Sequence, residues 1–287
     1  MVPEVLVGLN CRSGRLYVDG TLGEGGHATA ILLRTAPEGR LWGLDRDPAA
    51  LQAAAARLAP FTSRFCLFRR SYRQLGELLE EAQVPGVAGI LLDLGLSSFQ
   101  LGQSGRGFSF LTDEPLDMRF DPDDPGPTAA QLLNTMKEAE LAQMFWEWGE
   151  EPRARTLARA IVQARRRTPF RTTGQLSQLA SRVLGSGGRR RRHPATRVFQ
   201  ALRVAVNGEL EELAAFLAQA PAWLEPGGRL VVISYHSLED RAVKRQMQTW
   251  DRAGVMRTLT KKPVSPALEE VRRNPRARSA KLRAAER

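Results

Sequence analysis

Three aspartates are spaced along the chain so that they could surround one ligand. Asp19, Asp45 and Asp93 each end a short apolar run that reads as a buried strand. The carboxyl ends of parallel strands lie along one edge of an α/β sheet, and such sheets bind their ligands there. An acid at the end of the second strand, about 20 residues beyond a turn, suits a ribose diol. The pattern therefore predicts a nucleoside site.

A glycine-rich turn follows the first of these aspartates. The run Gly20–His27 leads into a helix expected over residues 28–34, and its glycines let the backbone approach a ligand at a helix N-terminus. The spacing is not that of the dinucleotide motif, and the turn has no lysine or arginine to meet a pyrophosphate. A plain tight turn is the alternative. Together with the three acids, the turn favours the sulfonium compound S-adenosylmethionine over a dinucleotide.

A parallel α/β sheet would position these residues. Strands alternating with helices predict such a sheet, covered on both faces. Asp47 and Pro48 carry the residue types of an N-cap and a first helical residue. The expected strands are 16–19, 41–45, 64–68, 89–93, 226–234, 255–260 and 279–285, and the expected helices of this part are 28–34, 48–58, 73–82 and 209–223.

The alternation of strands and helices stops after the fourth strand. Residues 113–127 are acidic and rich in proline and glycine, and residues 128–207 read as helices with polar breaks. We therefore predict an α/β domain made of residues 1–112 and 208–287. A helical insertion, residues 113–207, would interrupt it.

Positive charge is segregated along the chain. The formal net charge is +11, but residues 151–210 carry +12, residues 241–287 carry +10, and the remainder carries −11. A basic segment of this kind indicates a polyanionic partner, most often nucleic acid. We therefore predict RNA recognition by the insertion, with contacts from the arginine run, from the histidine that follows it and from the next helix: Arg189, Arg190, Arg191, Arg192, His193 and Arg197.

The sequence gives less support to a metal site or to a cysteine nucleophile. The three histidines have no metal-ligand spacing, so we expect no metal. Cys11 lies in an N-terminal turn and Cys66 within the third strand, so neither is expected to serve as a nucleophile for methylation at carbon-5. Two cysteines, no apolar run long enough to span a bilayer and no signal-peptide core favour the cytoplasm and exclude a membrane partner.

The whole chain resembles the RsmH (MraW) family of bacterial S-adenosylmethionine-dependent methyltransferases of small-subunit ribosomal RNA. The matching motifs occur in order along nearly all of its length: YVDGTLGEGGH, GLDRDPAAL, GILLDLGLSSFQL, RGFSF, PLDMR, HPATRVFQALR, GGRLVVISYHSLEDR and NPRARSAKLR. Two departures stand out. Tyr235 replaces a phenylalanine that is common in the family, and Val2–Leu6 lacks the family's usual histidine.

The resemblance implies a class I (Rossmann-like) methyltransferase sheet with an inserted helical domain. It also implies N4-methylation of a cytidine in the decoding centre of 16S rRNA in the small ribosomal subunit, and leaves a homodimer open. The cofactor contacts that it implies are Gly25, Gly26, His27, Asp45, Tyr72, Asp93 and Gln100.

Asp93 is the candidate catalytic residue. The N4 amine of cytosine is conjugated with the ring, and a carboxylate that accepts its N–H bonds would localise the lone pair for attack. His236 follows the fifth strand and is a second candidate for contacting the substrate, although a role as an orienting residue fits it equally well.

Two other functions compete with this hypothesis. One is a non-catalytic ribosome-assembly factor that uses the methyltransferase fold as a binding module. The other is methylation of protein or DNA, which would share the cofactor site but not the family motifs.

Overall fold

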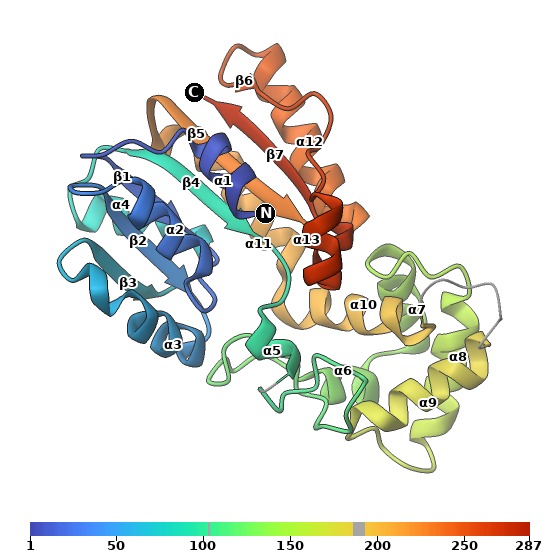
Figure 1. The fold of residues 1–287 in the computed structure, drawn as a ribbon. Helices are drawn as coiled ribbons and strands as arrows, with labels where there is room; N and C mark the ends of the chain where they lie inside the picture. Colours follow the sequence, from blue (N-terminus) through green and yellow to red (C-terminus); the bar gives the residue numbers. More distant parts are fainter. Residues whose placement is uncertain (103, 186–192) are drawn as a thin grey trace. The chain divides into compact units, whose positions relative to one another are not determined.

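The chain is divided into two compact units in a computed structural model that describes residues 1–102, 104–185 and 193–287. Unit 1 comprises Met1–Gly95 and Leu210–Arg287, and unit 2 comprises Leu96–Glu209. Both can be followed by colour in Figure 1. Each unit is described by itself below.

Unit 1 is built on a seven-stranded sheet with the order β3-β2-β1-β4-β5-β7-β6. The first five strands in this order are parallel, and β7 runs antiparallel to both β5 and β6. The strand order reverses between β1 and β4, which is the topological switch point of a doubly wound sheet. The strands are β1 (Leu16–Asp19), β2 (Arg40–Asp45), β3 (Phe65–Arg69), β4 (Val87–Asp93), β5 (Leu224–Ser234), β6 (Arg257–Thr258) and β7 (Lys281–Glu286).

Helices cover both faces of this sheet, as the sequence predicts (Figure 1). Neighbouring residues of one strand point to opposite faces, so in β4 Ile90 and Leu92 join one core while Leu91 joins the other. The first core is covered by α4 (Leu75–Glu81), α11 (Glu209–Trp223) and α12 (Ser237–Arg252), and the second by α1 (Val2–Leu9), α2 (Gly26–Arg34) and α3 (Pro48–Leu58).

Local sequence determines where α3 starts. The Asp47 side chain accepts a hydrogen bond from the Ala49 N–H, and Pro48 occupies the first turn, where its missing N–H costs nothing. Both expectations from the sequence are confirmed. The short α13 (Leu268–Arg273) and three 3-10 segments, Ala59–Phe61, Tyr72–Gln74 and Pro275–Ser279, complete the helical elements of unit 1.

Unit 2 is helical around its own core and begins earlier than the sequence predicts. Phe108, Leu116 and Met118 are buried in this core, so the irregular stretch before the first long helix belongs to the unit. The boundary therefore lies at Leu96 rather than at residue 113. Its helices are α5 (Ser98–Gly102), α6 (Ala129–Thr135), α7 (Glu138–Glu147), α8 (Ala154–Arg165), α9 (Thr173–Leu184) and α10 (Ala195–Asn207).

The connection over residues 113–127 is an ordered part of unit 2. Arg119 pairs with Asp117, its Nη2 lying 2.7 Å from Oδ2, and Phe120 N–H donates to Asn207 of α10 at 2.8 Å. Among the helices that the structure describes, none is long and apolar enough to span a bilayer.

Candidate active site

The predicted aspartates lie at the carboxyl ends of β1, β2 and β4, three strands that neighbour one another in the sheet. Asp93 is held by three groups. The Tyr235 hydroxyl donates to its Oδ1 at 2.9 Å, His27 Nε2 lies 3.4 Å from its Oδ2, and its own N–H donates to Thr21 Oγ1 at 2.6 Å. Asp93 therefore joins the glycine-rich turn after β1 to the end of β5.

The glycine-rich turn is held by Asp45. One carboxylate oxygen accepts the Gly23 N–H at 2.8 Å and the other accepts the Asp47 N–H at 2.9 Å. Each oxygen has a second lone pair, so the carboxylate retains acceptor positions for hydroxyl groups such as a ribose diol. Gly25 precedes α2 with a φ of 77°, a left-handed conformation that a side chain would strain.

Asp19 is the most deeply buried of the three carboxylates, at 1% exposure. Burial raises its pKa to about 7, and the charges of Asp93 and Asp45 add to this shift. The His27 ring and the Thr21 N–H oppose it without cancelling it. The site thus holds more negative charge than its own groups compensate, which favours a cationic ligand.

His27 is the basic group facing these carboxylates. Burial alone would lower its pKa, but the hydrogen bond and charge of Asp93, together with the charge of Asp19, raise it. Its other ring nitrogen, Nδ1, is buried and makes no hydrogen bond to the described protein. The protonated form is favoured, and an acceptor on a bound ligand would satisfy Nδ1.

Tyr235 is a site residue that the sequence hypothesis did not include. Its pKa is raised far above the usual range by burial and by the adjacent Asp93 charge, so the hydroxyl keeps its proton and donates. The position of Tyr235 in the sequence could have indicated this role. Tyr235 directly follows β5, which pairs with β4 in a register that places Ile233 beside Asp93. Finding it required knowing that β4 and β5 are neighbours.

Tyr72 and Gln100 lie in different units. Tyr72 follows β3 in a 3-10 turn, Tyr72–Gln74, and its ring packs edge-on against Phe216 at 5.5 Å between centroids. A Cβ on Gly20 would come within 3.0 Å of the Tyr72 Cβ, so this side chain adjoins the turn after β1. Gln100 is buried in α5 of unit 2, where its Oε1 accepts the Ser97 N–H. Their contacts with a cofactor stay predictions.

His236 contacts the first turn of α12. It precedes α12, where its Nδ1 faces the Glu239 N–H at 3.4 Å and its Nε2 lies 3.0 Å from the Glu239 carboxylate. Glu239 is itself buried and accepts the Tyr235 N–H at 2.9 Å. This geometry suits an orienting role, and contact between His236 and the substrate stays a prediction.

Both cysteines are free. Burial raises the pKa of Cys11 to about 11, so its thiol is protonated at neutral pH and is a poor nucleophile. Cys66 lies within β3, as the sequence predicts, and is exposed there.

The predicted RNA contacts are only partly described. Arg189, Arg190, Arg191 and Arg192 lie outside the described residues. His193 stacks on Phe110 with ring centroids 4.7 Å apart, and the half-exposed Arg197 lies 3.8 Å from the buried Glu151 carboxylate. Both therefore have packing or pairing partners within unit 2, and their RNA contacts stay predictions.

Comparisons with known proteins identify the family of this chain. The sequence profile of the MraW methylase family matches residues 1–287. The ribosomal RNA small subunit methyltransferase H of Thermomicrobium roseum is 49% identical, covering 100% of this chain and 92% of the relative. Its namesake from Geobacter sulfurreducens is 50% identical, covering 100% and 97%.

Among solved structures, an rRNA methylase from Streptococcus thermophilus aligns with a TM-score of 0.45 at 10% identity, covering 100% of this chain and 93% of that chain. The strand order and pairing of the sheet define the doubly wound fold without this distant likeness.

Proposed function

Because the chain belongs to the MraW methylase family and is thus a methyltransferase, we propose that it methylates a cytidine of 16S rRNA at the exocyclic N4 amine. The methyl donor is S-adenosylmethionine, and the cytidine lies in the decoding centre of the small ribosomal subunit. The name that both relatives carry, ribosomal RNA small subunit methyltransferase H, supports RNA as the substrate.

The aspartate cluster is the observation that carries this proposal. No lysine or arginine of the described chain pairs with Asp19, Asp45 or Asp93, and burial raises the pKa of Asp19 and of Asp45. His27 is thus the one basic side chain of the described residues that faces this cluster, and three carboxylates sharing a single partner are costly unless a ligand supplies further positive charge. S-adenosylmethionine carries a sulfonium and an ammonium group, so these residues fit it.

Different residues would bind different parts of S-adenosylmethionine. Asp45 would hold the ribose hydroxyls, because its carboxylate has acceptor positions left after binding the turn. Gly25 and Gly26 allow close approach of the backbone at the start of α2. His27, Asp93, Tyr72 and Gln100 complete the proposed set. When bound, S-adenosylmethionine supplies an electrophilic methyl group.

Asp93 is the group that would act on the cytidine. Its carboxylate would accept an N–H bond of the N4 amine, hold the amine in line and favour the lone pair over conjugation with the ring. His27 and Tyr235 fix the carboxylate from two sides, so little reorganisation would accompany the reaction. The amine would gain positive charge as the N–C bond forms and the S–C bond of the donor breaks, and the neighbouring carboxylates would stabilise that charge. Asp93, which accepts the N–H bond, would then take the proton that the nitrogen loses.

Replacing Tyr235 with phenylalanine tests this positioning. We expect kcat to fall about tenfold, because a hydrogen bond to a charged group contributes about 1.5–3 kcal/mol and only part of that acts on the rate. The KM for S-adenosylmethionine should change less than twofold. Steady-state kinetics on small subunits would separate the two effects. An unchanged kcat, with folding intact by circular dichroism, would remove Tyr235 from the machinery.

Transfer of a labelled methyl group tests the function itself. Small subunits from cells that lack the modification, incubated with the protein and methyl-labelled S-adenosylmethionine, should carry label in the RNA fraction and not in the protein fraction. Large subunits serve as the control substrate. Binding of S-adenosylmethionine by calorimetry without transfer to small subunits would instead favour the assembly-factor hypothesis.

A further inference from the structure

Unit 2 contains a long stretch of chain without acids. Between Pro152 and Gly208 the sequence has fourteen arginines and no aspartate or glutamate. Several of these arginines have structural partners: Arg159 pairs with Glu138, Arg165 caps the Leu133 carbonyl, and Arg203 pairs with Glu209. The arginines without such partners therefore need a separate explanation.

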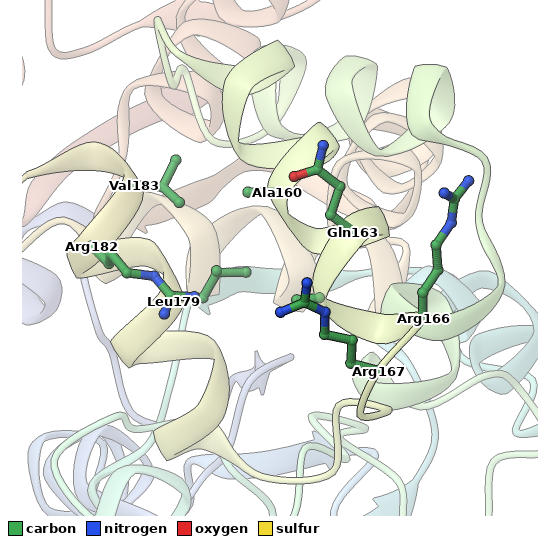
Figure 2. Close-up of a pocket in the computed structure, with 8 residues that line it drawn as sticks. Ala160, Gln163, Arg166, Arg167, Leu179, Arg182 and Val183 are labelled. Carbon is green, nitrogen blue, oxygen red and sulfur yellow. The ribbon is translucent and has the colours of Figure 1, made fainter.

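Three of the remaining arginines line one groove between α8 and α9. Arg166 and Arg167 follow the end of α8, and Arg182 lies in the last turn of α9. The groove has a volume of 610 Å³ and continues past Arg167 and Arg182 toward Phe170. Figure 2 shows the Arg167 and Arg182 side chains extending toward one another between the two helices.

These three guanidinium groups are available to a ligand. All three side chains are exposed, and none makes a hydrogen bond or an ion pair with any residue that the structure describes. Like charges that share a groove repel one another, and nearby acids would normally offset that repulsion. Here none of the lining residues is acidic.

The floor of the groove has a different character. Ala160, Ala164, Leu179 and Val183 form an apolar surface between the arginines, and Gln163 and Gln178 add amide groups beside it. Guanidinium groups bind phosphates in a bidentate manner. An apolar floor can accept a sugar or base face, while the side-chain amides can reach polar edges. This combination suits a nucleic-acid strand better than an isolated anion.

We propose that the groove lined by Arg166, Arg167 and Arg182 binds backbone phosphates of the ribosomal RNA substrate. The proposal rests on the proposed function, since it takes RNA as the partner. It adds three arginines that were not among the RNA contacts predicted from the sequence. Such contacts would position the substrate without selecting its sequence.

The salt dependence of RNA binding tests the groove. The variant Arg166→Gln/Arg167→Gln/Arg182→Gln removes three charges from it. The control Arg153→Gln/Arg155→Gln/Arg171→Gln removes three exposed charges of the same unit that do not line it. Binding of a 16S rRNA fragment is measured between low and moderate salt. The plot of log affinity against log salt should lose about 2 from its slope in the groove variant, because each phosphate contact contributes about 0.7–0.9.

The control variant should lose less than half as much slope as the groove variant. Equal losses in both variants would mean that only the overall positive field matters, which would overturn the proposal. An unchanged slope in the groove variant would also overturn it. Lost binding to polyglutamate with unchanged binding to RNA would assign the groove to an acidic protein segment instead. Equal unfolding temperatures and S-adenosylmethionine affinities would establish that both variants fold.

The experiments distinguish a wrong groove proposal from a wrong proposed function. If the wild-type protein methylates small subunits while the groove variant keeps the full salt slope, only the groove proposal fails. If the wild-type protein transfers no methyl group, the proposed function fails, and the slope still tests whether the groove binds RNA.

Discussion

Replacing Asp93 with asparagine is expected to lower kcat for methyl transfer to small subunits by about 10²–10³-fold. Asparagine has nearly the same shape but carries no charge, and one of its two terminal atoms is a donor. The His27 ring and the Tyr235 hydroxyl can reorient to face an amide, so the local fold should survive. The amine of the substrate would then lose a fixed anionic acceptor.

The measurement is single-turnover transfer at saturating S-adenosylmethionine, which separates the rate from any loss of cofactor affinity. A matched control is Asp117→Asn in unit 2, which alters an aspartate paired with Arg119 outside the cluster. Transfer by Asp93→Asn at the wild-type rate would show that the carboxylate takes no part in the reaction.

Replacing Asp19 with asparagine is expected to stabilise the ligand-free protein and weaken its cofactor binding. The pKa of Asp19 in the fold, about 7, lies well above the ordinary value of 3.8. The folded state therefore favours the protonated form, and the ionised carboxylate lowers stability above pH 7. The penalty declines as the pH falls from 7 toward 4. A shift of this size corresponds to about 4 kcal/mol at most.

Denaturant unfolding should thus show a gain of about 2–4 kcal/mol for Asp19→Asn at pH 8, and almost none at pH 4. The substitution Asp240→Asn should have the opposite effect on the free energy of unfolding. Asp240 is paired with Arg283 at 2.7 Å and Lys281 at 3.0 Å, and its pKa is lowered. Removing its charge leaves the buried Arg283 without a counter-ion, so stability should fall at pH 8.

Calorimetry should show that the Asp19→Asn variant binds S-adenosylmethionine about tenfold more weakly at pH 8, since a nearby negative charge is lost. In the wild-type protein, affinity should decline below about pH 7, where Asp19 takes up its proton. His27 and Asp93 lie beside Asp19 in the same site and could also change their protonation. The pH dependence of S-adenosylmethionine affinity should therefore be measured for the His27→Ala variant as well. Destabilisation by Asp19→Asn at pH 8 would contradict the account of this carboxylate.

The sequence was most informative where local pattern alone determines structure. Short apolar runs ending in acids predicted β1, β2 and β4, because a buried parallel strand needs little besides apolar side chains. Asp47 and Pro48 predicted the start of α3 because capping is a local interaction. The sheet edge that carries the aspartates was therefore predictable.

Features that depend on distant contacts were missed. The helix α12 is largely polar, and its buried positions Val243, Met247 and Trp250 are helical in spacing but sparse. The start of unit 2 depends on Phe108 and Leu116 entering a core formed mainly by later helices. Neither feature can be read from neighbouring residues alone.

The most direct test of the central claim is the identity of the methylated nucleoside. Small subunits that lack the modification are treated with the protein and labelled S-adenosylmethionine, and the RNA is digested to nucleosides for mass spectrometry. We expect label on the N4 amine of one cytidine of 16S rRNA, and far less product with Asp93→Asn. Label at carbon-5 of the base, on a ribose or on a ribosomal protein would contradict this expectation.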